Sequence, residues 1–137
     1  MHLLRLTAFA ALFATVLPAT LAAAKPPLRE VPEIADGIFT IVVANEIRRH
    51  CDDINGRIFK GIGEIRRLRA RANDLGYSDN EIRAVLDSDD EKERMRARGR
   101  TYMAQKGLNY DKPGDLCRLG RLEIQSNSAI GALLKAN

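Results

Sequence analysis

The chain has 137 residues, which is enough for one folded domain but not for two domains with separate cores. Its formal net charge at pH 7 is only +4, so contact with acidic components is compatible with the sequence without being required by it. Tryptophan is absent and aromatic residues make up 5% of the chain. This composition argues against a surface that stacks sugars or bases.

The chain opens with a segment, residues 1–24, that is typical of a cleavable secretory signal peptide. A short, weakly positive start is followed by an almost wholly apolar run at 6–17, and Pro18 ends that run. An Ala-x-Ala pattern then precedes a cut ahead of Lys25. An uncleaved anchor and a buried first helix are the alternatives, but the apolar run is short for a membrane span, which needs roughly 20 residues.

Export would leave a protein with neither a membrane span nor a lipid anchor. No cysteine precedes Cys51, so there is no lipobox thiol to acylate, and no later segment is apolar over 18 residues. The first residues lack a twin-arginine pair, which favours export in the unfolded state and argues against a cofactor loaded in the cytoplasm. We therefore predict a soluble periplasmic or secreted protein without a cofactor.

Two cysteines remain in the predicted mature chain, Cys51 and Cys117. In an oxidising compartment a lone pair most simply forms an intramolecular disulfide. Free thiols and an intermolecular bond are the alternatives. Loss of the signal peptide removes one basic residue, so 21 basic against 18 acidic residues leave a mature net charge of +3.

The first part of the mature chain predicts an extended arm and two helices. Three prolines favour an extended arm at 25–34, and helical spacing of apolar residues indicates a first helix at about 35–50. The clearest helix is expected at about 53–75, capped by Asp52 or Asp53. It carries one apolar stripe, formed by Ile54, Ile58, Ile62, Ile65, Leu68, Ala72 and Leu75. Three glycines inside it predict the close approach of a neighbouring helix, at Gly56, Gly61 and Gly63.

Three more helices are expected after this one. Two capping boxes of the form Ser-x-x-Glu predict a short helix at 79–87 and a longer one at 89–106. A turn containing Pro113 leads into a helix at about 114–126, and the tail is expected to dock as a last short turn. The sequence thus predicts an all-α protein, a small array of about five helices with one disulfide. Residues 35–137 would form a single helical domain.

Two clusters invite a catalytic or metal-binding interpretation. His50 is the only histidine of the predicted mature chain and stands beside Cys51, but adjacent residues on a helix point in different directions, and an oxidised cysteine offers no thiolate. The acidic run at 87–91 lacks the glycine and glutamate that a calcium loop of the EF-hand type requires. No haem-attachment motif, nucleophile elbow or phosphate loop is present. We therefore expect neither a metal nor an enzymatic activity.

Arginine-rich stretches at 66–71 and 94–100 would suggest nucleic acid in a cytosolic protein. Export and the interspersed carboxylates argue against nucleic acid here. Four basic residues nevertheless share one side of the predicted second helix, Arg57, Lys60, Arg67 and Arg71. A solvated helix face explains them most simply, and a surface for an acidic partner or an anionic envelope polymer is the alternative.

Three segments of the predicted mature chain are distinctive together: KPPLREVPEI at 25–34, LGYSDNEIRAVLDSDDEKERMRARGRTYMAQKGL at 75–108 and SAIGALL at 128–134. They resemble a family of small exported alphaproteobacterial proteins classed as a domain of unknown function. The resemblance covers nearly all of the mature chain and includes both cysteine positions. It implies a helical exported domain, and it implies no activity or functional residues.

Three functions remain open on sequence alone. The first is a non-enzymatic accessory module that binds another envelope protein, since no catalytic constellation is visible and basic helix faces lie on a small stapled scaffold. The second is a binder of anionic envelope ligands or polymers through those faces. The third is an enzyme whose site assembles from scattered residues. The oligomeric state does not follow from the sequence.

Overall fold

The computed structural model describes residues 24–137, so the predicted signal peptide lies outside the described residues except for its last position. Five α-helices dominate this part, which confirms the predicted all-α class and its five helices. The elements in chain order are η1 (Leu28–Glu30), α1 (Pro32–His50), β1 (Ile54–Gly56), α2 (Ile58–Asp74), α3 (Asp79–Asp87), α4 (Asp89–Gln105), α5 (Pro113–Gln125), η2 (Gly131–Leu133) and β2 (Leu134–Ala136).

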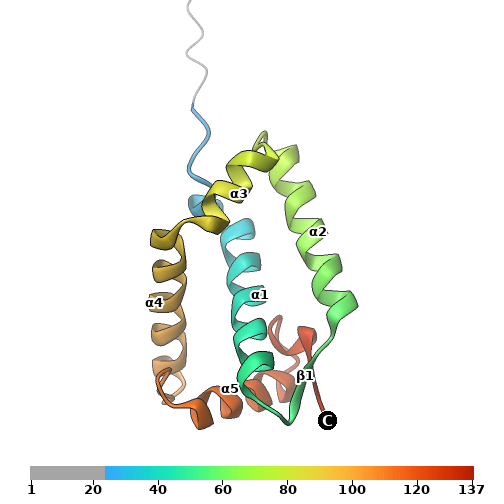
Figure 1. Cartoon of the computed structure of the whole chain (residues 1–137), viewed down its shortest axis with the longest axis vertical. Coiled ribbons are helices and arrows are strands. Elements are labelled where there is room, and N and C mark those ends of the chain that lie inside the picture. The colour runs from blue at the N-terminus through green and yellow to red at the C-terminus, as the bar shows by residue number, and fades with distance from the viewer. Residues whose placement is uncertain (1–23) are drawn as a thin grey trace, which may run out of the picture.

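Helix α1 lies between α2 and α4, while α3 crosses from the end of α2 to the start of α4 and α5 closes the opposite end (Figure 1). Because α1 has neighbours on several sides, its buried residues are not confined to one stripe. Phe39, Val43 and Ile47 face a core shared with α4 and α5. Ile34 belongs to a second core, shared with η1 and α2.

The N-terminal arm is shorter and more firmly attached than the sequence predicts. It is extended only to Pro27, η1 follows, and α1 begins at Pro32, where proline's missing N–H costs no helical hydrogen bond. The Lys25 ammonium donates to the Glu81 carboxylate (3.0 Å), and the Tyr77 hydroxyl donates to the Pro26 carbonyl. Leu28 is 4% exposed. The arm is therefore packed into the fold and joins the start of α1 to the start of α3.

The predicted helix at 53–75 starts later than expected. Residues Ile54–Gly56 instead form β1, which pairs antiparallel with β2, and Ile54 lies opposite Ala136. The backbone N–H of Arg57 then donates to the Leu133 carbonyl (2.7 Å) before α2 begins. The expected caps Asp52 and Asp53 thus precede a strand and not a helix. The last short turn expected in the tail is present as η2.

The two predicted capping boxes differ in the structure. Ser78 Oγ accepts from the N–H of Glu81 (3.2 Å) and the Glu81 carboxylate accepts from the N–H of Ser78 (2.6 Å), so the first box is complete. Ser88 Oγ accepts from the N–H of Glu91 (3.4 Å). The Glu91 carboxylate, however, lies 3.3 Å from Arg29. The second box is therefore half formed, because its glutamate binds an arginine of η1.

Acidification is expected to loosen the start of α3. The backbone hydrogen bond from Ser78, followed by the bond from Lys25, lowers the pKa of Glu81 from its ordinary 4.5 to about 2. A carboxylate with a depressed pKa in the folded state contributes stability above pH 4.5, and this contribution is lost as the pH falls from about 4.5 to about 2. Urea unfolding followed by circular dichroism at a series of pH values measures the loss. Glu81→Gln should flatten the profile, whereas Asp90→Asn, a matched change at a nearby helix start, should not.

The disulfide between Cys51 and Cys117 is present, as predicted, with 5.5 Å between the two Cα atoms. It joins the residue after α1 to the second turn of α5. The Cys51 residue is 4% exposed and belongs to the core beneath α5. The bond thus ties the two helices that meet at the end of the molecule opposite α3 (Figure 1).

Candidate functional site

The apolar stripe of α2 is buried in one half and exposed in the other. Leu68 and Ala72, in the C-terminal half, pack against Ile34 of α1 and are 5% and 1% exposed. The N-terminal half carries four exposed large apolar side chains, here called the α2 apolar patch: Ile58 (54%), Phe59 (91%), Ile62 (41%) and Ile65 (52%). An exposed group of this kind, on a helix with charged neighbours, is typical of an interaction surface.

Glycine positions explain why the two halves differ. On α1, a Cβ added to Gly37 would lie 2.5 Å from Leu68 Cδ2, so this glycine lets the C-terminal half of α2 approach closely. On α2 itself, nothing lies within 4 Å of a Cβ added at Gly61 or Gly63. The expectation of a close neighbouring helix at these two glycines is therefore wrong, and the helices separate where the patch begins.

Four cations border the patch, and we call them the flanking cations: Arg48, Arg57, Lys60 and Arg66. Arg66 follows Ile62 by one helical turn. Arg48 reaches the patch from α1, because a Cβ on Gly56 would lie 2.6 Å from Arg48 Cδ and 3.4 Å from Ile58 Cδ1. Among residues 24–137 none of these cations has a carboxylate within ion-pair distance. Their charges remain available to a partner.

The basic face predicted from the sequence is divided in the structure. Arg67 bonds to Glu64 (2.7 Å) and to Glu33 of α1 (3.2 Å), and Arg71 also bonds to Glu33 (2.9 Å). The hydrogen bond from Arg71 is the main reason that the pKa of the Glu33 carboxyl is lowered, and the bond from Arg67 lowers it further. Arg67 and Arg71 therefore form surface ion pairs between α2 and α1, and their charges are offset there. The other two predicted residues, Arg57 and Lys60, are among the flanking cations, and the Arg57 side chain also donates to the Leu134 carbonyl (3.1 Å).

One buried carboxylate was not predicted to matter. Glu123 of α5 is 1% exposed and accepts from the hydroxyls of Tyr102 (2.6 Å) and Ser128, while the Lys106 ammonium lies 3.4 Å away. Burial, followed by the bond to Glu123, holds the pKa of Tyr102 well above its usual range. The sequence does contain a signal for this residue, because Glu123 follows Leu116 and Leu119 at the spacing of the apolar face of α5.

The Glu123 cluster borders a cavity of about 360 Å³, which makes it the nearest approach to an assembled catalytic site in the described residues. Both carboxylate oxygens already accept hydrogen bonds, and Asp36 at the cavity is bound by Arg98 (2.6 Å). No histidine contributes to the lining. The hydrogen bonds of Glu123 thus join α4, α5 and the C-terminal segment.

A second, apolar groove of about 310 Å³ lies between α1, α3 and α4. Val42, Val85 and Met95 are among the residues that line it. The charges at its mouth pair within the protein, as in the bond between Arg29 and Glu91 (3.3 Å). Tyr110, whose ring is approached by the Arg100 guanidinium (5.4 Å to the ring centre), also lines the groove.

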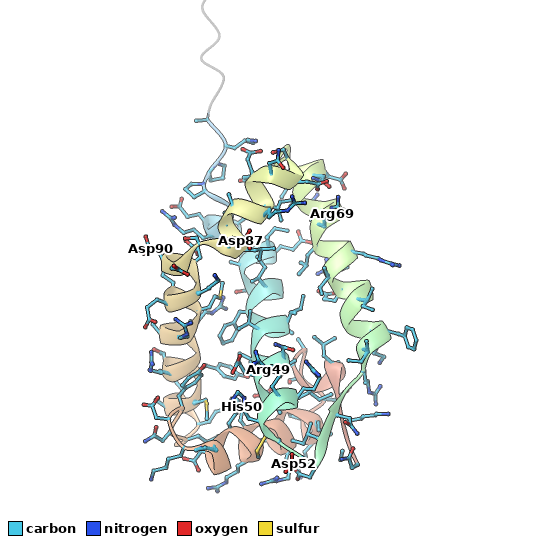
Figure 2. The ribbon with its side chains drawn as sticks, viewed as in Figure 1. Arg49, His50, Asp52, Arg69, Asp87 and Asp90 are labelled. Atoms are coloured by element: carbon cyan, nitrogen blue, oxygen red, sulfur yellow. A yellow bond between two sulfur atoms is a disulfide. The ribbon has the colours of Figure 1, made fainter. Side chains whose placement is uncertain are left out.

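The two clusters singled out in the sequence are placed at opposite ends of the molecule (Figure 2). His50, the one histidine within residues 24–137, has its Nδ1 2.8 Å from the Glu46 carbonyl, while Cys51 is in the disulfide. The acidic run lies at the junction of α3 and α4, where Asp87 and Asp90 are labelled. Within residues 24–137 no group of three or more histidine, cysteine, aspartate or glutamate residues could hold a metal ion.

The fold and the surface together define a class: a small, disulfide-linked, all-α domain with an apolar and basic face on one helix. The chain belongs to a family of unknown function, DUF5333, whose model matches residues 26–135. No curated protein and no solved structure matches the chain. Across residues 24–137, no helix combines the length and the apolar character needed to cross a membrane.

Proposed function

We propose that the protein is a non-enzymatic docking module of the bacterial cell envelope. It is exported by its signal peptide and binds another envelope component through the α2 apolar patch and the flanking cations. The observation that carries the proposal is the exposure of the α2 apolar patch beside four cations that have no carboxylate within ion-pair distance in residues 24–137. The partner could be another envelope protein or an anionic envelope ligand. In either case the flanking cations favour a partner whose surface is negatively charged.

Two further observations support this proposal. Two groups that could carry chemistry have structural partners: Cys51 forms a disulfide, and both oxygens of Glu123 accept hydrogen bonds. The disulfide itself is typical of the periplasm and of secreted proteins. The intact mass of the protein recovered from the periplasm or the medium would test export. It should correspond to a chain that starts at Lys25 and contains the oxidised cysteine pair.

The docking surface can be tested in living cells by placing a photo-crosslinking amino acid at position 59 or, as a control, at position 90. Phe59 lies in the exposed patch, whereas Asp90 lies in the first turn of α4 beyond the far end of α2. We expect an adduct with an envelope protein or with a lipid from position 59 that Lys60→Glu with Arg66→Glu removes, and none from position 90. The absence of any protein or lipid adduct at 59, or equal adducts at both positions, would overturn the proposal.

A further inference from the structure

We infer that the surface on which α2 docks is a phospholipid bilayer rich in anionic headgroups. This inference rests on the proposed function and names its partner. Helix α2 has 17 residues and carries five basic and two acidic side chains along its length, so it is suited to lie in the interface between headgroups and acyl chains. The protein would then be held at the membrane surface by one helix face.

The apolar half of the binding comes from the patch. Ile58, Ile62 and Ile65 are spaced by four and three residues and share one side of the helix. Phe59 is next to them and is 91% exposed, so its ring contacts almost nothing of its own chain. An aromatic ring and three isoleucines on one helix are the anchors that interfacial helices insert among acyl chains.

The electrostatic half comes from the flanking cations. Long basic side chains at the border of an apolar patch can keep their charges at headgroup level while the patch inserts. Arg66 follows the patch by one turn, and Arg48 borders it from α1 beside Ile58. The only acidic residue in the first four turns of α2 is Glu64, and Arg67 already binds it (2.7 Å). This face of α2 therefore presents no unpaired negative charge that would repel a uniformly anionic surface.

The same charges make a second copy of the chain a poor partner. Two patches placed face to face would bring the flanking cations of both molecules together, and like charges close to one another are destabilising. A protein partner would need an apolar groove with an acidic rim in the matching pattern. An anionic bilayer supplies acyl chains for the patch and negative headgroups for the cations, and it needs no matching pattern of sites. It can also deform around the protruding Phe59 ring.

The experiment uses the mature chain and a single fluorescent reporter. The chain contains no tryptophan, so Phe59→Trp introduces the only one, at an exposed position where the fold has no contact to lose. The probes are vesicles of phosphatidylcholine alone and vesicles that also contain phosphatidylglycerol. We expect a blue shift of the emission and quenching by brominated acyl chains only with the anionic vesicles, and weaker binding as salt is raised.

Charge variants in the Phe59→Trp background separate a specific face from general attraction. Lys60→Glu with Arg66→Glu should weaken vesicle binding by about thirtyfold or more, because two attractive charges become repulsive. The matched control is Arg83→Glu with Arg94→Glu, which changes the net charge of the protein by the same amount but at sites on α3 and α4. It should bind as the parent does. Equal losses in both pairs, or equal binding to neutral vesicles, would overturn the inference.

The outcomes for the two proposals are distinguishable. No binding to anionic vesicles, combined with a protein adduct from position 59 in cells, would overturn the bilayer and leave the docking module standing. No vesicle binding and no adduct would overturn both. Concentration-dependent self-association of the parent that Phe59→Trp or Ile62→Ser abolishes would show that the patch binds a second copy, and would also overturn the bilayer.

Discussion

Replacing both cysteines, as Cys51→Ala with Cys117→Ala, is expected to lower the free energy of unfolding by about 4 kcal/mol. The two residues are 66 positions apart, and their bond closes a loop that contains α2, α3 and α4. Without the bond the unfolded chain gains the conformational freedom of that loop, which is the main source of the loss in the chain-entropy model. Urea unfolding of parent and variant, followed by circular dichroism, gives the difference.

The native protein treated with a reducing agent provides the control for this prediction. It should lose nearly as much stability as the double variant, because reduction opens the same loop while both cysteine side chains stay in place. A double variant that unfolds at the parent's urea concentration would contradict the chain-entropy account. It would show that the packing between α1 and α5 alone holds this end of the molecule.

Removal of the buried carboxylate, as Glu123→Ala, is expected to lower the free energy of unfolding by about 3 kcal/mol. The half-buried Tyr102 and Ser128 hydroxyls would both lose the carboxylate that accepts from them, and that carboxylate belongs to a residue that is 1% exposed. An unsatisfied buried donor costs roughly 1–3 kcal/mol, and the missing side chain adds a cavity. Glu123 binds Tyr102 of α4 and Ser128 of the segment after α5, so its removal should weaken the attachment of both to α5.

Two companion variants identify the cause. Glu123→Gln keeps the shape and one oxygen acceptor, so its loss of stability should be smaller than that of Glu123→Ala. Glu93→Ala removes an exposed carboxylate that pairs with Arg96 (3.0 Å) on the solvent side of α4, and surface ion pairs of this kind contribute little. If Glu93→Ala destabilises the protein as much as Glu123→Ala, burial is not the reason for the importance of Glu123.

The sequence predicts the helices well because their signals are local. The capping box at Ser78 and the proline at the start of α5 depend on residues within one turn of each other, and both are present in the structure. The disulfide follows from the number of cysteines and the predicted export. By contrast, β1 and β2 are three residues each and pair across almost the whole domain, so no local pattern announces them.

The candidate site could be predicted only in part. Ile58 and Ile62 continue the same apolar period as Leu68 and Ala72, so periodicity alone cannot tell the exposed half of α2 from the buried half. The difference arises from Gly37 on another helix. Likewise, the charge of Arg71 is offset by Glu33, which lies 38 residues away in the sequence. Both facts depend on which helices become neighbours.

The attached arm constrains where the predicted signal peptide can be cut without loss to the fold. Lys25, the first residue after the predicted cut, already bonds to Glu81, and Leu28 lies in the core beside Tyr77. A cut a few residues further along would therefore remove side chains that the fold uses, and heterogeneous cleavage would yield molecules of unequal stability. On the proposed export, the accuracy of cleavage at one alanine would then set how uniformly the mature molecules fold.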